Sequence, residues 1–317
     1  MRFEISKIRI KLIVLLALTS ILAAGCAGEP AAEVPVSLQE MQPFEGGIGM
    51  LVFSAQVDSG SPFDVYSLDL ESRELTQLTE SGSADISPSY SPVGERIVFS
   101  SDREGTYDLY DLDLGSGEAA QITEVESDET EPRISPEGLL VVYQTDAYGD
   151  FDIMTRNLAT GEETRLTEGD AQETQAAWSP DGKLIAYLSN EDGDFDVYVM
   201  DRVGAMREQI TENTSYEAAP VWAPDGSAIT YLSKRGDHYQ LYSMDLELRE
   251  ETILTDGSAT VHSPAWSPDG AYLAYVQEGA TGAQINVFAV ESDAHFLLTD
   301  VFAKYARLEW HPKIAGD

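Results

Sequence analysis

One pattern of about 44 residues is repeated six times along this chain, and it constrains the fold more than any other feature of the sequence. Two independent columns of residues recur with this period. An aromatic residue or Ile falls at Tyr90, Ile134, Trp178, Trp222, Trp266 and Trp310, and a Leu-Thr or Ile-Thr pair begins at Leu78, Ile122, Leu166, Ile210, Leu254 and Leu298. Every step in both columns is 44 residues, which excludes coincidence.

Each repeat is predicted to form four short β-strands. In the repeat 175–211, the segments QAAW, KLIAYLS, FDVYVMD and REQIT are rich in β-branched and aromatic residues and are separated by Gly, Pro, Asp and Asn. The turn SPDG at 179–182 has Pro in its second position and Gly in its fourth, as a type I turn favours. Because helical periodicity is absent, we expect an all-β, six-bladed β-propeller of four-stranded antiparallel blades.

The ends of the chain are out of phase with the repeat. The first predicted strand, 50–54, corresponds to the second strand of a blade, whereas the last, 306–310, corresponds to a first strand. We therefore expect the last blade to be completed by strands from both termini, which closes the ring without an unpaired edge. The periodic aromatic residues are then predicted to pack between the blades as core.

The repeat also resembles that of a known family. The motif Glu-x-x-Pro-x-Trp-x-Pro-Asp-Gly at 217–226, with Tyr-x-Met-Asp at 242–245 and Leu-Thr at 254–255, resembles the TolB-type β-propeller repeat, which is WD-repeat-like. The resemblance covers about residues 48–312 and is specific for fold. It is weakly specific for function, because similar repeats occur in TolB-type envelope proteins, in prolyl-oligopeptidase-like enzymes and in oligogalacturonate lyases.

Two functions follow from the resemblance. We expect a binding or scaffold protein of the cell envelope that uses a propeller face to bind a protein or another ligand and is not an enzyme. The alternative is a polysaccharide-cleaving enzyme of the oligogalacturonate-lyase type, with a metal ion in its channel.

The first 25 residues have the character of an export signal. Four basic residues precede an apolar run at 12–24 that is too short to span a bilayer comfortably. The run ends in Ala23-Ala24-Gly25-Cys26, which resembles a lipoprotein lipobox, although Leu22 lies one position earlier than is usual. An ordinary signal peptide that contains a cysteine is the alternative.

We expect cleavage before Cys26 and attachment of lipid to its thiol. The protein would then be exported and anchored to a bacterial cell membrane on its periplasmic or extracytoplasmic side. Residues 26–47 are rich in Ala, Pro, Glu and Gly and are predicted to form a flexible linker to a propeller at 48–317.

The net charge limits the possible partners. The chain has 19 Lys and Arg against 56 Asp and Glu, a net charge of −37, which becomes −40 when residues 1–25 are removed. Such a surface repels phosphates, so we expect no nucleic acid as a partner. A protein or a cationic or metal-bridged ligand on an acidic face fits better, and we expect a monomer without a cofactor.

The strongest candidate for a ligand site is a column three positions before the proline of the repeat. Its members are Asp85, Glu129, Glu173, Glu217, Val261 and Tyr305. Each is predicted to start an innermost strand near the mouth of the channel, where like charges attract a cationic ligand. The predicted ligand-binding set is Asp85, Glu129, Glu173, Glu217, His262 and Tyr305. The alternative is that the carboxylates accept structural hydrogen bonds.

No metal site is assigned from the sequence. The loop NEDGD at 190–194 is rich in carboxylates, but it lacks the spacing and the distal Glu of an EF-hand. His238 and His262 are predicted to lie on the same face. Their clustering with channel carboxylates around one point would favour the enzyme.

We predict that Cys26→Ser releases the protein from membranes into the soluble fraction, because it removes the thiol that would carry the lipid. Fractionation of cells that express either form measures this. Membrane retention equal to that of the parent would show that Cys26 is not the anchor.

Overall fold

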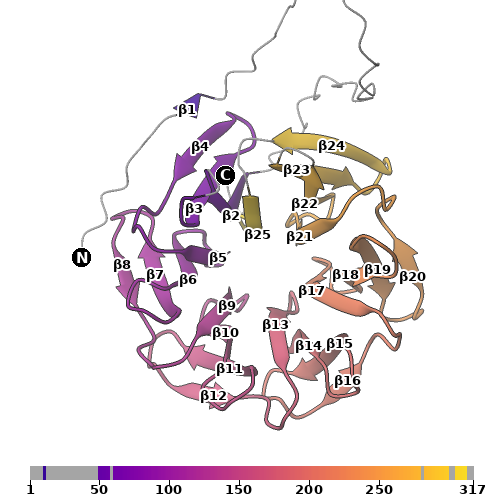
Figure 1. The fold of residues 1–317 in the computed structure, drawn as a ribbon, viewed down its shortest axis with the longest axis horizontal. Coiled ribbons are helices and arrows are strands. Elements are labelled where there is room, and N and C mark those ends of the chain that lie inside the picture. The colour runs from indigo at the N-terminus through magenta and orange to yellow at the C-terminus, as the bar shows by residue number, and fades with distance from the viewer. Residues whose placement is uncertain (1–9, 12–48, 58–59, 280–281, 300–303, 313–317) are drawn as a thin grey trace, which may run out of the picture.

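The computed structural model describes residues 10–11, 49–57, 60–279, 282–299 and 304–312, and this part of the chain is all-β. Six antiparallel sheets stand in a ring around a central axis (Figure 1). The predicted six-bladed β-propeller is therefore confirmed.

The blades are numbered in chain order. Blade 1 contains β2 (Met50–Gln56), β3 (Asp64–Asp69), β4 (Glu74–Gln77) and β25 (Lys304–Trp310). Blade 2 contains β5 (Asp85–Tyr90), β6 (Arg96–Ser101), β7 (Asp108–Asp113) and β8 (Ala119–Gln121). Blade 3 contains β9 (Glu129–Ile134), β10 (Leu140–Thr145), β11 (Asp152–Asn157) and β12 (Glu163–Arg165).

Blade 4 contains β13 (Glu173–Trp178), β14 (Leu184–Ser189), β15 (Asp196–Asp201) and β16 (Arg207–Gln209). Blade 5 contains β17 (Tyr216–Trp222), β18 (Ala228–Lys234), β19 (Gln240–Asp245) and β20 (Glu251–Ile253). Blade 6 contains β21 (Val261–Trp266), β22 (Tyr272–Gly279), β23 (Gly282–Ala289) and β24 (Ala294–Thr299). The first strand of each repeat is innermost, and the fourth lies at the rim (Figure 1).

The ring is closed in blade 1 by strands from both ends of the chain, as predicted. β25 pairs antiparallel with β2, and the register runs from Leu51 opposite Trp310 to Gln56 opposite Lys304. A two-residue strand, β1 (Ile10–Lys11), pairs with β4 on the outer edge of the same blade.

The rest of the predicted signal peptide, Cys26 and the predicted linker lie outside the described residues. Cleavage, lipid attachment and the division at residue 48 therefore stay predictions. Within the described part of the chain, no helix has the length and apolar character that crossing a bilayer requires.

The hydrophobic core lies between neighbouring blades. One cluster joins Ala186 and Val197 of blade 4 to Trp222 and Tyr231 of blade 5. Another joins side chains of blades 1 and 2 around the fully buried Phe99. The periodic aromatic residues are thus core, as predicted, and no blade could bury its apolar faces without a neighbour on each side.

The tryptophan column also forms hydrogen bonds from blade to blade. The indole N–H of Trp178 donates to the carbonyl of Arg133 at 3.1 Å, and that of Trp222 donates to the carbonyl of Ala177 at 3.1 Å. Trp310 donates to the carbonyl of Ala265 at 2.8 Å. Each of these acceptors lies 45 residues before its donor in the sequence, so each bond reaches the preceding blade of the ring.

We predict that deletion of residues 304–317 abolishes cooperative unfolding. The deletion leaves β2 with an open edge and removes Tyr305, Leu308 and Trp310 from the core of blades 6 and 1. Thermal unfolding followed by circular dichroism tests this, with deletion of residues 313–317 alone as the control. A chain without β25 that melts sharply near the parent temperature would show that another contact closes the ring.

Candidate functional site

The two faces of the propeller differ in chemistry. We call the face at which the innermost strands begin the strand-start face, and it is where the acidic column was predicted. The opposite face, where these strands end in the Ser-Pro-Asp-Gly-type turns, is the turn face.

The acidic residues of the predicted column lie inside the wall of the propeller. Asp85, Glu129 and Glu173 are the first residues of β5, β9 and β13, and Glu217 is the second residue of β17. At most 2% of the surface of each is exposed. The column is therefore not a ring of free carboxylates, and ligand binding by it stays a prediction.

Each of these carboxylates accepts a hydrogen bond from the hydroxyl group directly opposite on the second strand. The pairs are Ser101 with Asp85 at 2.6 Å, Thr145 with Glu129 at 2.9 Å, Ser189 with Glu173 at 3.3 Å and Ser233 with Glu217 at 2.7 Å. In the other two blades the column holds Val261 and Tyr305, which lie opposite Gln277 and Ala55. Acid and hydroxyl are present together or absent together, which favours a structural role for the pair.

A second acidic column faces the first across the contact between blades. Its members are Asp64, Asp108, Asp152 and Asp196, at the start of the third strands. Four carboxyl pairs result: Asp64 with Asp85, Asp108 with Glu129, Asp152 with Glu173 and Asp196 with Glu217. Blades 5 and 6 have Gln240 and Gln284 at this position, and the following first strands carry Val261 and Tyr305. The two columns are therefore acidic at the same four contacts between neighbouring blades.

Burial raises the pKa of one carboxyl in each pair, and the neighbouring carboxylate raises it further. The pKa of Asp64 is raised to about 7, and those of Glu129 and Glu173 are also raised to about 7. The pKa of Glu217 is raised to about 8. The raised pKa favours the protonated form of Asp64, Glu129, Glu173 and Glu217 near neutral pH, so these four groups contribute less negative charge than the sequence suggests.

The two other predicted site residues, His262 and Tyr305, both contact neighbouring side chains of the propeller. His262 Nδ1 is 3.0 Å from Ser263 Oγ, and its Nε2 is 3.0 Å from Glu278 Oε1. Burial lowers the pKa of His262, which favours the neutral imidazole. The ring of Tyr305 packs edge-on against Phe53 in the core, with ring centres 5.4 Å apart.

The histidines do not form a metal centre in the described part of the chain. His238 Nδ1 is 3.1 Å from Thr260 Oγ1, and His295 Nδ1 is 2.9 Å from the hydroxyl of Tyr275. Among the described residues, no group of three or more close carboxylate, thiol or imidazole ligands includes a histidine. Clustering of His238 and His262 with channel carboxylates, the condition that would favour a polysaccharide-cleaving enzyme, is not observed there.

A third column, which sequence reasoning missed, lies two residues after the acidic one. Each innermost strand has a β-bulge there, and the bulge residue adopts a left-handed conformation with φ between 48° and 56°. The six residues are Ser87, Glu131, Gln175, Ala219, Ser263 and Arg307. The period of 44 residues was the available signal, but none of the six is a glycine that would mark the conformation.

The bulge residues link neighbouring innermost strands around the axis. Ser87 Oγ donates to Glu131 Oε1 at 3.0 Å. The backbone N–H of Ala219 donates to Gln175 Oε1 at 2.7 Å, and that of Arg307 donates to Ser263 Oγ at 2.9 Å. Backbone strain of this kind persists only where surrounding contacts impose it, and these bonds supply such contacts.

Two ion pairs join β9 to β25 across β5. Arg133 Nη1 lies 2.5 Å from Glu309 Oε2, and Arg307 Nη2 lies 3.0 Å from Glu131 Oε2 at an angle that makes no hydrogen bond. Burial lowers the pKa of Arg307 to about 10, with a further contribution from Arg133, and burial raises the pKa of Glu309. The innermost strands thus carry two cations that are paired with two carboxylates, and not carboxylates alone.

The turn face holds a cavity of about 440 Å³ on the propeller axis, which we call the bowl. Every blade contributes a proline from its first turn: Pro92, Pro136, Pro180, Pro224, Pro268 and Pro312. Tyr90, Trp178, Trp222, Trp266 and Trp310 also line it, and the ion pair of Arg133 with Glu309 is its charged element. The bowl is therefore mainly apolar, in contrast to the acidic protein surface.

The turns that form the bowl pack on one another. Gly138 has a φ of +75°, and a Cβ there would lie 3.3 Å from Cδ of Pro92 in the preceding turn. The left-handed conformation and this close approach both require the glycine that ends the turn. The same approach to the proline of the preceding turn recurs at Gly182, Gly226 and Gly270, so the turns of blades 2 to 6 pack on one another.

Comparison with known proteins gives the relatives of this chain. The family model described as the TolB beta propeller domain matches residues 46–176 and 171–312. The structure of TolB from Acinetobacter baumannii is similar with a TM-score of 0.75 and 21% identity, over 84% of this chain and 67% of that chain. A putative TolB from Agrobacterium tumefaciens has a TM-score of 0.67 and 20% identity, over 80% of this chain and 88% of that chain.

Enzymes share the fold. An oligogalacturonate lyase in complex with manganese is similar with a TM-score of 0.58 and 20% identity, over 80% of this chain and 74% of that chain. At such identities the likeness to these solved structures shows the fold alone.

The carboxyl pairs predict a pH dependence of stability. A carboxyl whose pKa is raised to about 7 on folding stabilises the native state fully below its unfolded pKa of 4.5, and this stabilisation is lost as the pH rises through 7. Glu129→Gln with Glu173→Gln fixes the neutral form. We expect it to raise the free energy of unfolding at pH 8 by about 1–3 kcal/mol and to change it little at pH 5.

Denaturant unfolding at both pH values measures this effect. Glu118→Gln with Glu124→Gln is the control, since it removes two exposed carboxylates. A lower stability of the Glu129/Glu173 variant at pH 8 would show that the native structure favours the charged carboxylates, and that folding does not raise their pKa.

Proposed function

Because the chain belongs to the TolB β-propeller family, we propose that it is a non-enzymatic binding protein of the bacterial cell envelope that docks a protein partner in the bowl of its turn face. It would be exported, and lipid on Cys26 would hold it at a membrane. The predicted linker at 26–47 would separate the propeller from that membrane.

The bowl is the observation that carries this proposal. Its volume of about 440 Å³ lies in the range of ligand pockets, which are concave and mostly apolar with a few polar groups. Tryptophan, tyrosine and arginine, which supply most strong interface contacts in proteins, all line it. The packed turns of blades 2 to 6 preorganise the site, so little order has to be gained on binding.

The partner that fits is a protein segment with an apolar anchor residue and basic flanks. The anchor would fill the space between the prolines and tryptophans, and the pair of Arg133 with Glu309 would meet the backbone or a polar side chain. The net charge of −37 would attract the basic flanks and speed association.

The acidic column at the strand-start face is the alternative binding site for the partner. Its carboxylates are buried and bonded to hydroxyl groups, so a partner could reach them only after the wall had opened. The same experiment therefore tests both faces.

We predict that Val221→Trp abolishes capture of the partner. Val221 lines the bowl and is half-buried, so the larger side chain occupies the space that the anchor residue would fill. The mature chain from residue 26 onward would be used to capture proteins from envelope extract at low and at high salt. We expect at least a tenfold loss of bound partner in the variant, which corresponds to about 1.4 kcal/mol.

Val203→Trp is the matched control. It introduces the same side chain at an exposed position in the loop between β15 and β16, away from the bowl. Capture by this control and by the Glu129→Gln, Glu173→Gln variant should equal that of the parent. Loss of capture in the Glu129/Glu173 variant, with capture retained by Val221→Trp, would place the site at the strand-start face instead.

A further inference from the structure

The ring of blades begins at the edge of the bowl. The carbonyl of Met50, the first residue of β2, accepts the backbone N–H of His311 at 2.7 Å. Leu51 lies opposite Trp310 in the pairing of β2 with β25. Because Trp310 and Pro312 line the bowl, the segment that precedes β2 leaves the ring beside this cavity.

Contacts from two blades hold this starting point. The backbone N–H of Leu70, which follows β3 in blade 1, donates to the carbonyl of Gly49 at 3.1 Å. The ring of His311 packs on that of Tyr90 in blade 2, with ring centres 4.7 Å apart. Tyr90 itself lines the bowl. The predicted linker therefore joins the ring at a defined position, where blades 1 and 2 meet.

The predicted linker contains apolar residues that a spacer does not need. Its second half reads VPVSLQEMQPFEGG at 34–47, and Phe44 is the only aromatic residue between positions 26 and 47. Gly46 and Gly47 follow, and glycine allows the backbone to reverse its direction at low cost. Met50 is six residues beyond Phe44, a step that spans at most about 20 Å. Phe44 is therefore tied within reach of the bowl.

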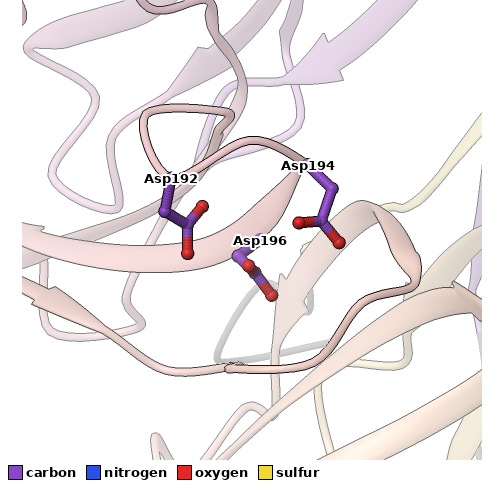
Figure 2. A group of neighbouring side chains, drawn as sticks. All are labelled: Asp192, Asp194 and Asp196. Atoms are coloured by element: carbon purple, nitrogen blue, oxygen red, sulfur yellow. The ribbon is translucent and has the colours of Figure 1, made fainter.

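The charge of the predicted linker favours the bowl over the opposite face. The linker has four glutamates and no Lys or Arg. On the strand-start face, the hairpin between β14 and β15 gathers Asp192, Asp194 and Asp196, with one carboxylate oxygen of each within 4.8 Å of the others (Figure 2). Like charges repel an acidic segment from such a surface. In the bowl the charges of Arg133 and Glu309 are paired, and the remaining lining is mainly apolar.

We propose that the chain's own segment 34–47 occupies the bowl when no partner is bound, with Phe44 as its anchor residue. The aromatic side chain would lie among the prolines and tryptophans that line the cavity. Residues 26–33 would still connect the propeller to the membrane. The inference rests on the proposed function, because it concerns the regulation of the same cavity.

This contact would set the affinity that a partner must exceed. A segment joined to its site by a short connection has an effective concentration in the millimolar range, so a weak contact is enough to fill the bowl. The acidic protein repels the glutamates of the segment and attracts the basic flanks of a partner. Salt screens both effects, so the segment competes better with the partner as the ionic strength rises.

The test uses the tryptophans of the bowl as its signal. The chain has four tryptophans, and all four line the bowl: Trp178, Trp222, Trp266 and Trp310. A nitroxide label quenches tryptophan emission at short range. In the mature chain from residue 26, Cys26→Ser with Gln42→Cys places such a label two residues before Phe44. We expect the label to lower the emission, and Phe44→Ser in the same labelled chain to restore it.

A label at residue 29 is the matched control. Glu29→Cys with Cys26→Ser places the nitroxide 15 residues before Phe44 in the same linker, so it should quench the emission less than the label at residue 42. Equal quenching from both positions, or quenching at residue 42 that Phe44→Ser leaves unchanged, would overturn the proposal.

A synthetic peptide of residues 34–47 separates this inference from the proposed function. It should bind the mature chain that carries Phe44→Ser, and at least tenfold more weakly when Val221→Trp is added. Equal binding to both chains would place the segment outside the bowl and overturn the proposal. No peptide binding, with a captured partner that Val221→Trp releases, would overturn self-occupancy and leave the proposed function intact.

Discussion

The contact between neighbouring blades is the constraint on which the rest of the structure depends. A four-stranded blade has two apolar faces and can bury neither alone, so each blade is stable only between two others. The clusters that join Ala186 to Tyr231 and Val52 to Phe99 lie in this contact, and so do the indole hydrogen bonds of the tryptophan column. Closure by β25 supplies the last such contact, which makes the ring a single cooperative unit.

The same contact governs the polar groups. The paired carboxyls, of which Asp108 and Glu129 are one example, come from adjacent blades, and burial raises the pKa of Glu129 to about 7. On the axis, Arg133 and Arg307 each meet a carboxylate from another blade.

Function is expected where a blade departs from the repeat. Six equivalent prolines and the aromatic column build a symmetric bowl, but among the described residues that line it the ion pair comes from blades 3 and 1, through Arg133 and Glu309. Arg165 is a departure of the same kind at the other face, since blades 1, 2 and 4 have Gln77, Gln121 and Gln209 at its position. A near-symmetric scaffold thus carries charged groups that distinguish one blade from another.

The sequence by itself determined the number of blades, their four strands, the turns and the closure by both termini, because each depends on residues close together in the chain or on the period of 44. It also contained the pairing of Glu129 with Thr145, since acid and hydroxyl recur 16 residues apart. Only the tertiary structure decided that these carboxylates lie inside the wall. Their exposure depends on a bulge that no glycine marks, as at Glu131, and on an aspartate from another blade. The pair of Arg133 with Glu309, 176 residues apart, was likewise decided by ring closure, which brings the two ends of the repeat together around one axis.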